Sequence, residues 1–164
     1  MRRSIFGLIV GAVLASAACA DDRVSIGIGA GPLNAGLGVN VAMTSDRDFK
    51  FFALGCIASY RHSNGHSGNA CGVGVGWLRT DWFSGVPSKH GLGAYIGPVA
   101  ARRTINDDND GNEDLVTRYG AAMSYVYFFS GAGKPGFHLG VAPAAYRVNG
   151  ATKGDLLVQL GYQF

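Results

Sequence analysis

The feature that most constrains this chain is a strict alternation of large apolar and small residues, repeated along its length. In the stretch VSIGIGAG, which begins at Val24, a large apolar residue occupies every second position and Ser or Gly lies between. A period of two places the two sets on opposite faces of a β-strand. Each such stretch is therefore predicted to be a strand with one bulky face and one small face.

Seven further stretches show this period, and they occupy residues 35–43, 49–61, 71–79, 91–103, 118–129, 137–146 and 156–164; the stretch at 49–61 is longer and less regular than the others. The connectors between them are rich in Gly, Pro, Asn, Asp and Ser, as tight antiparallel connections require. None is long enough for a parallel crossover. The chain is therefore predicted to be all-β, with one domain of eight antiparallel strands.

The composition of the two faces indicates where each points. The small face holds mostly Gly, Ala and Ser, with hardly any of the Lys and Glu that a water-facing strand carries. The bulky face is apolar, with aromatic residues near the strand ends at Trp77, Tyr119, Tyr127, Phe129, Tyr162 and Phe164. A narrow barrel with the bulky residues facing lipid and the small residues facing the lumen would suit both faces. Its closed ladder would also pair every backbone group. The prediction is an eight-stranded antiparallel up-and-down transmembrane β-barrel, in which Pro98 and Pro143 each need a bulge or a place near a rim.

The first twenty residues, MRRSIFGLIVGAVLASAACA, have the layout of a secretory signal peptide. Two arginines precede a short apolar run, and Ala18 and Ala20 form a cleavage motif. We therefore expect residues 1–20 to be removed and residues 21–164 to form the barrel. A membrane anchor or a lipidated Cys19 is the alternative, although Ser16 departs from the lipoprotein pattern. Loss of Arg2 and Arg3 leaves 12 basic against 11 acidic residues, which argues against nucleic-acid binding.

The signal peptide, the eight alternating segments and the aromatic C-terminal strand together resemble the small eight-stranded bacterial outer-membrane barrels, the class of the outer membrane protein A transmembrane domain. The resemblance is architectural. It implies export to the bacterial outer membrane, contact with its lipid and lipopolysaccharide, and assembly by the barrel-assembly machinery. Leu160, Tyr162 and Phe164 would form the assembly signal. With both termini in the periplasm, the connector GPLN at residues 31–34 is expected on the outer side.

Cys56 and Cys71 are the only cysteines after the signal peptide, and they flank one connector. They could meet across neighbouring strands, and the oxidising periplasm favours a disulfide bond over two buried thiols.

Two polar connectors contain candidate site residues. Asn106, Asp108 and Asp110 begin a calcium-loop pattern, but Thr117 stands where its bidentate Glu belongs, so a solvated acidic loop is the favoured interpretation. His62 and Ser63 faintly resemble the His-x-Ser pair of lipid A deacylases, but they are adjacent here. Zinc binding through His62 and His66 lacks the usual ligand spacing. No cofactor or resident metal is therefore expected.

The favoured hypothesis is a non-enzymatic outer-membrane barrel that acts in envelope integrity or surface contact through its extracellular loops, whose partner the sequence does not identify. A lipid-modifying barrel enzyme and a soluble periplasmic barrel that binds an apolar ligand are the alternatives.

Overall fold

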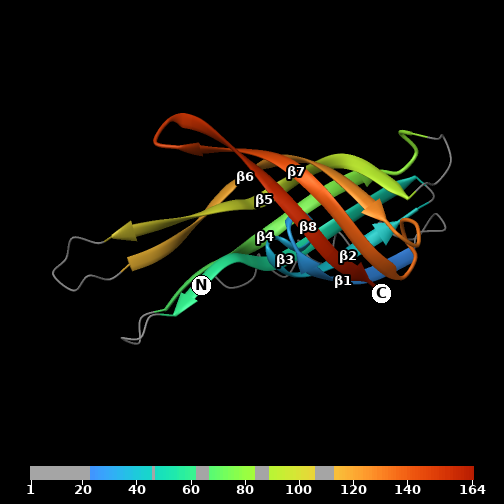
Figure 1. Ribbon diagram of the computed structural model, residues 1–164, viewed down its shortest axis with the longest axis horizontal. Helices are drawn as coiled ribbons and strands as arrows, with labels where there is room; N and C mark the ends of the chain where they lie inside the picture. The colour runs from blue at the N-terminus through green and yellow to red at the C-terminus, as the bar shows by residue number, and fades with distance from the viewer. Residues whose placement is uncertain (1–22, 46, 62–66, 84–88, 106–112) are drawn as a thin grey trace, which may run out of the picture.

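The computed structural model describes residues 23–45, 47–61, 67–83, 89–105 and 113–164, so the predicted signal peptide lies outside it. The described strands are β1 (Arg23–Ala30), β2 (Leu37–Thr44), β3 (Asp48–Arg61), β4 (Ser67–Arg79), β5 (His90–Ile105), β6 (Glu113–Phe128), β7 (Gly136–Val148) and β8 (Ala151–Gln163). Each pairs antiparallel with the next, and β8 returns to pair with β1 (Figure 1). The predicted all-β, eight-stranded, up-and-down closed barrel is confirmed.

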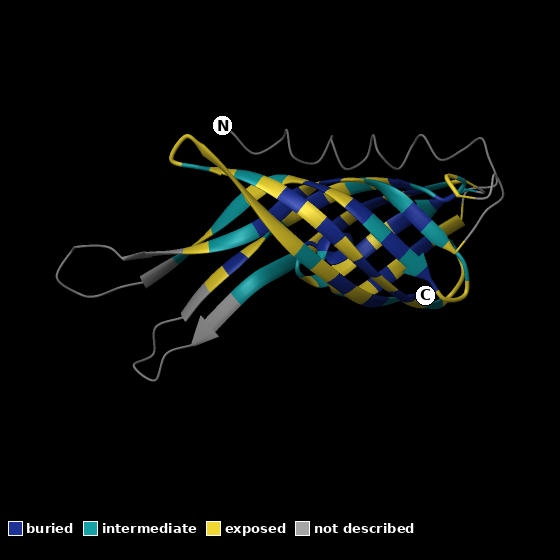
Figure 2. Ribbon diagram, turned by 45° about the horizontal axis from the view of Figure 1, so that its top comes forward, coloured by how far each residue is buried: buried dark blue, intermediate teal, exposed yellow. Residues whose placement is uncertain are grey.

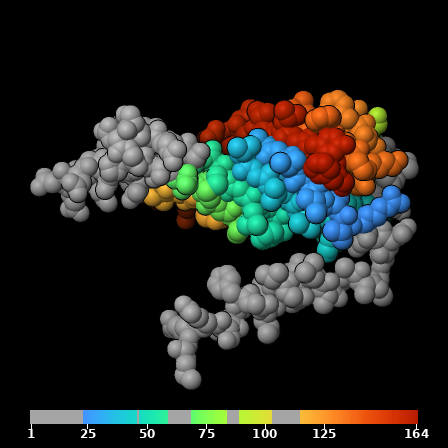
Figure 3. Space-filling model, turned by 90° about the horizontal axis from the view of Figure 1, so that it is seen from below, coloured from blue at the N-terminus to red at the C-terminus, as the bar shows by residue number. Residues whose placement is uncertain are grey.

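The alternation in the sequence becomes an alternation between the outside and the inside of the barrel. Figure 2 shows it as a checkerboard of exposed and buried residues over the wall. On β1, for example, Ile26 and Ile28 are exposed outside, whereas Ser25 is buried inside. Figure 3 shows the side chains of β8, β1 and β2 forming one continuous surface where the first and last strands meet. The bulky face thus points outward, as predicted.

The two prolines within the strands are accommodated differently. At Pro98 the pairing of β5 with β6 shifts register before Ala100, which is the bulge that the sequence requires. At Pro143 the register is kept, and the β6–β7 ladder is interrupted between the pairs Ala122–Ala144 and Tyr125–Val141. Because proline has no N–H to donate, an interrupted ladder is enough there, and no bulge is needed.

The strands extend further at one end of the barrel than at the other. The β3–β4, β5–β6 and β7–β8 hairpins project beyond the short β1 and β2 (Figure 1). The β7–β8 hairpin closes with a two-residue turn in which Asn149 and Gly150 have φ of 50° and 82°. Positive φ at both positions matches the type I′ turn, whose twist suits a hairpin. We call this the hairpin end, and the opposite end, which holds the chain's C-terminus, the rim end.

The first connector lies at the hairpin end but turns inward. It forms a short 3-10 helix, η1 (Pro32–Asn34), and Leu33 is fully buried. Gly31 and Gly36 form its base with φ of 104° and 105°, and each donates its N–H to the other's carbonyl oxygen. These left-handed conformations favour glycine. This connector therefore fills the lumen at the hairpin end, and its predicted place on the outer side of a membrane stays a prediction.

Candidate functional site

The outer wall carries a belt of large apolar side chains to which every strand contributes. One member from each strand is Ile26, Val39, Leu54, Val75, Ile96, Met123, Leu139 or Val158, and these are 45–63% exposed. On β7 the belt runs from Phe137 to Ala145, about 26 Å of strand at about 3.3 Å per residue. Soluble monomers rarely expose a continuous apolar surface of this kind. The belt is therefore a candidate contact surface in its own right.

Aromatic rings border this belt at the rim end. Phe83, His90, Tyr125, Tyr127 and Phe129 form a row in which neighbouring ring centroids lie 5.1–6.3 Å apart. A second row consists of Phe137, Tyr162 and Phe164, with spacings of 5.0 and 4.9 Å. Amphipathic aromatic rings concentrate where a protein surface passes from lipid to water.

A polar cluster lies at the same end of the barrel. The Arg79 guanidinium donates from Nε to Asp81 Oδ1 at 2.9 Å and from a second nitrogen to Oδ2, while Arg47 lies 4.0 Å from the same carboxylate. The hydrogen bonding to Arg79 holds the pKa of Asp81 below its usual range. Trp77 Nε1 donates to Asp48 Oδ1 at 2.7 Å. The rim end therefore combines rings and charges.

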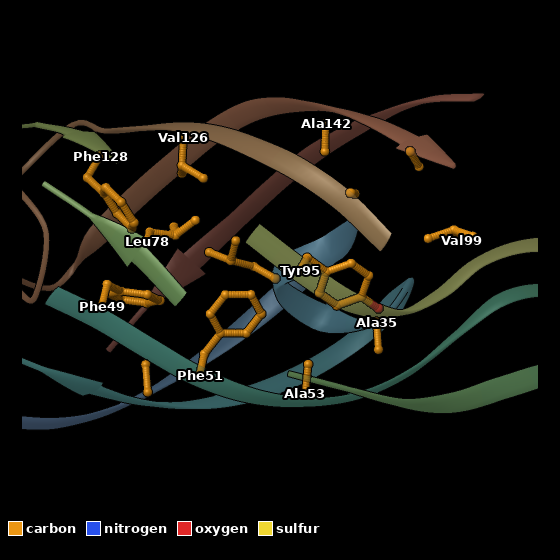
Figure 4. Packing of buried hydrophobic residues seen from close by; sticks show 14 residues of the cluster. Ala35, Phe49, Phe51, Ala53, Leu78, Tyr95, Val99, Val126, Phe128 and Ala142 are labelled. Atoms are coloured by element: carbon orange, nitrogen blue, oxygen red, sulfur yellow. The ribbon is translucent and has the colours of Figure 1, made fainter. Parts of the chain in front are cut away.

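One side of the lumen is apolar and tightly filled. Phe49, Phe51, Tyr95, Leu78 and Phe128 gather inside the barrel (Figure 4). The Phe51 and Tyr95 rings are stacked with centroids 6.3 Å apart, and the Phe49 and Phe128 rings lie at 5.2 Å. The inward face was predicted to hold mostly Gly, Ala and Ser, and large rings also enter the lumen, where they fill the space that the inward glycines leave.

The other side of the lumen carries a hydrogen-bond network that the alternating pattern did not predict. Gln163 Nε2 donates to Ser25 Oγ at 2.9 Å and to Asn40 Oδ1 at 3.2 Å. Asn40 Nδ2 donates in turn to Asn34 Oδ1 at 2.9 Å. A Cβ at Gly27 would lie 2.4 Å from both amide groups above it, so the network needs glycine there. The network links η1 to the strands on both sides of the β1–β8 closure.

A signal for this network was present in the sequence. Asn40 and Gln163 occupy the small face of their strands, where long polar side chains are out of place. An inward amide in a narrow barrel needs a partner from another strand. The period of each strand predicts that the amides point inward, but it does not tell which of them meet.

The predicted site residues have different outcomes. Cys56 and Cys71 are directly opposed on β3 and β4 and form a disulfide bond, as expected. Leu160 and Phe164 are exposed on the outer face of the last strand, and the Phe164 N–H donates to the Ile26 carbonyl at 2.8 Å. Tyr162 is partly buried between aromatic neighbours. Their role in assembly stays a prediction.

The weaker candidates cannot be placed. His62, Ser63, Asn106, Asp108 and Asp110 all lie outside the described residues. Within the described part of the chain, no group of three or more His, Cys, Asp or Glu side chains is arranged to hold a metal ion. In the same part, no helix has the length and apolar character needed to cross a membrane.

Comparisons with protein-family models, with curated proteins and with solved structures gave no match.

Proposed function

We propose that this chain is an integral outer-membrane β-barrel, and the observation that carries the proposal is the apolar belt around all eight strands. The transfer of these apolar side chains from water into lipid has a favourable free energy. Because the strand ladder is closed, the centre of the barrel wall has no free sheet edge. A protein that spans the hydrocarbon layer must pair its backbone groups in this way. The aromatic rows at the rim end then fit one membrane–water interface.

The role proposed for the barrel is non-enzymatic contact at the cell surface or maintenance of the envelope. The lumen is filled by rings on one side and by hydrogen-bonded amides on the other, which argues against an open pore. The longest features outside the belt are the β3–β4, β5–β6 and β7–β8 hairpins (Figure 1). We infer that these hairpins face the exterior and carry the contacts, while the barrel anchors them.

Fractionation of cells that express the full chain tests membrane insertion. The folded protein should stay with the outer membrane, require detergent for extraction and migrate differently on a gel before and after boiling. Protease added to intact cells should cleave in the hairpins. Release into the soluble periplasmic fraction would refute insertion and favour the soluble ligand-binding barrel. A change in the acylation of lipid A when His62 is replaced would instead favour the lipid-modifying enzyme.

A matched pair of variants on one strand tests the belt directly. Val158 lies within the belt on β8 and is 63% exposed, and Thr152 lies on the same face nearer the turn. In lipid, Val158→Arg near the bilayer midplane should lower the free energy of unfolding by about 2–4 kcal/mol, whereas Thr152→Arg should change it little. Equal stability of the two folded variants in lipid vesicles would contradict the proposal.

A further inference from the structure

Three polar side chains inside the barrel have no hydrogen-bond partner within the described part of the protein. They are Ser124 on β6, His138 on β7 and Gln159 on β8, and all three are fully buried. The Oγ of Ser124, both ring nitrogens of His138 and both amide atoms of Gln159 are unpartnered. Native proteins rarely leave so many buried polar atoms unsatisfied in one place.

The strand register brings these three side chains around one glycine. Gly140 on β7 pairs with Gln159 on one side and with Val126, two residues from Ser124, on the other. Gln159 Nε2 lies 2.8 Å from the point that a Cβ on Gly140 would occupy, so the amide leans over this glycine. His138 lies two residues from Gly140 on the same inward face. We call this group the Gly140 cluster.

A second glycine continues the floor of the cluster. His138 pairs with Gly161, and its Nε2 lies 2.7 Å from the position of a Cβ there. The imidazole and the Gln159 amide therefore lie over diagonal glycines on adjacent strands, on the inward side of the barrel wall. A side chain at either glycine would displace one of them.

The chemistry of the cluster suits a neutral guest. A neutral imidazole, an amide and a hydroxyl together offer both donors and acceptors and bring no fixed charge. The inward residues beside them, Val126 and Ala142, are apolar. Such a set matches a hydroxyl group, which both donates and accepts, better than it matches a phosphate or a metal ion.

The neighbouring network offers two more atoms of the same kind. Asn34 Nδ2 and Gln163 Oε1 are also buried and have no hydrogen-bond partner among the described residues, although the other polar atom of each amide is hydrogen-bonded. Above the cluster, β7 presents the small side chains of Ala142 and Ala144 to the lumen, followed by Tyr146, which packs against the apolar core.

We propose that the Gly140 cluster is a binding site for neutral hydroxyl groups, supplied by bound water or by a small polyol. The proposal depends on the lumen alone, so it stands or falls separately from the membrane location.

Nuclear magnetic resonance on the isotope-labelled full chain, folded in detergent, tests the site directly. Persistent cross-peaks between water and the Gln159 side-chain amide would identify water as the guest. Saturable shifts confined to Ser124, His138 and Gln159 during a glycerol titration would identify a polyol. The absence of both signals would overturn the proposal.

A substitution provides an independent thermodynamic test. If Gln159 bonds to a guest, Gln159→Leu should lower the urea midpoint of unfolding, because those bonds are lost. If the cluster is dry, the same change removes an unsatisfied amide and should raise the midpoint, which would contradict the proposal. Asn40→Leu is the control, because it breaks bonds between protein groups and should lower the midpoint in either case.

Discussion

Replacing Asn40 by leucine tests whether the lumen network stabilises the closed barrel. Asn40 is 1% exposed and lies at the centre of the network, where it accepts from Gln163 at 3.2 Å and donates to Asn34 at 2.9 Å. Leucine branches at the same carbon as asparagine and fills nearly the same space. The substitution therefore removes the hydrogen bonds with little change in packing.

The expected cost follows from the bonds that are lost. Two neutral hydrogen bonds contribute about 1 kcal/mol each, and an acceptor left buried without a donor, here Asn34 Oδ1, costs about 1–3 kcal/mol more. The free energy of unfolding should therefore fall by about 3–5 kcal/mol. For a small protein that loses about 2 kcal/mol of stability per molar urea, the midpoint should fall by about 1.5–2.5 M.

The assay is urea unfolding of the full chain in detergent, followed by tryptophan fluorescence and by gel mobility of unboiled samples. Val41→Leu is the matched control, because it makes the same new residue one position further along β2 on the exposed face. It should leave the midpoint almost unchanged. If Asn40→Leu and Val41→Leu unfold at the same urea concentration, the network does not contribute to stability as argued.

Three further predictions concern packing, assembly and the disulfide. Gly74→Ala would place a methyl group 2.5 Å from an inward tyrosine ring and should lower the free energy of unfolding by about 1–3 kcal/mol. Gly154→Ala is the control, because the new methyl group meets nothing nearer than 3.7 Å and should leave stability unchanged. Equal urea midpoints for the two variants would contradict this. Phe164→Ala should reduce the amount of barrel assembled in cells, while the purified variant still folds in detergent; unchanged levels in the outer membrane would argue against an assembly signal. Reduction of the Cys56–Cys71 bond, which closes a span of 15 residues, should lower the free energy of unfolding by about 3 kcal/mol in calorimetry, and two free thiols in the mass spectrum of the untreated mature chain would refute the bond.

The alternating pattern alone was enough to predict the wall of the barrel. Residues such as Ile26 and Val158 repeat at a period of two, and that period assigns the face of every strand without knowledge of its neighbours. A disturbed strand ladder at Pro98 could also be predicted from the sequence, because proline has no N–H to donate. Pro143 shows the limit, since an interrupted ladder served where a bulge or a rim position was expected.

The filling of the lumen was only partly predictable. Phe49 and Phe51 belong to a stretch with large residues on both faces, so the pattern did not show that their rings enter the barrel. Their fit depends on glycines of other strands, such as Gly76, whose Cβ would lie 2.3 Å from the Phe51 ring. A local pattern contains no information about that distance.

By itself, the sequence determined the number of strands, their order and the outward face of each, because these follow from short-range periodicity and tight connectors. Only the tertiary structure decided which side chains contact one another inside the barrel. The inward turn at residues 31–36 depends on space that the closed wall provides. The bond between Asn40 and Gln163 joins residues 123 positions apart. Closure of the barrel brings such residues together, and closure is a property of all eight strands at once.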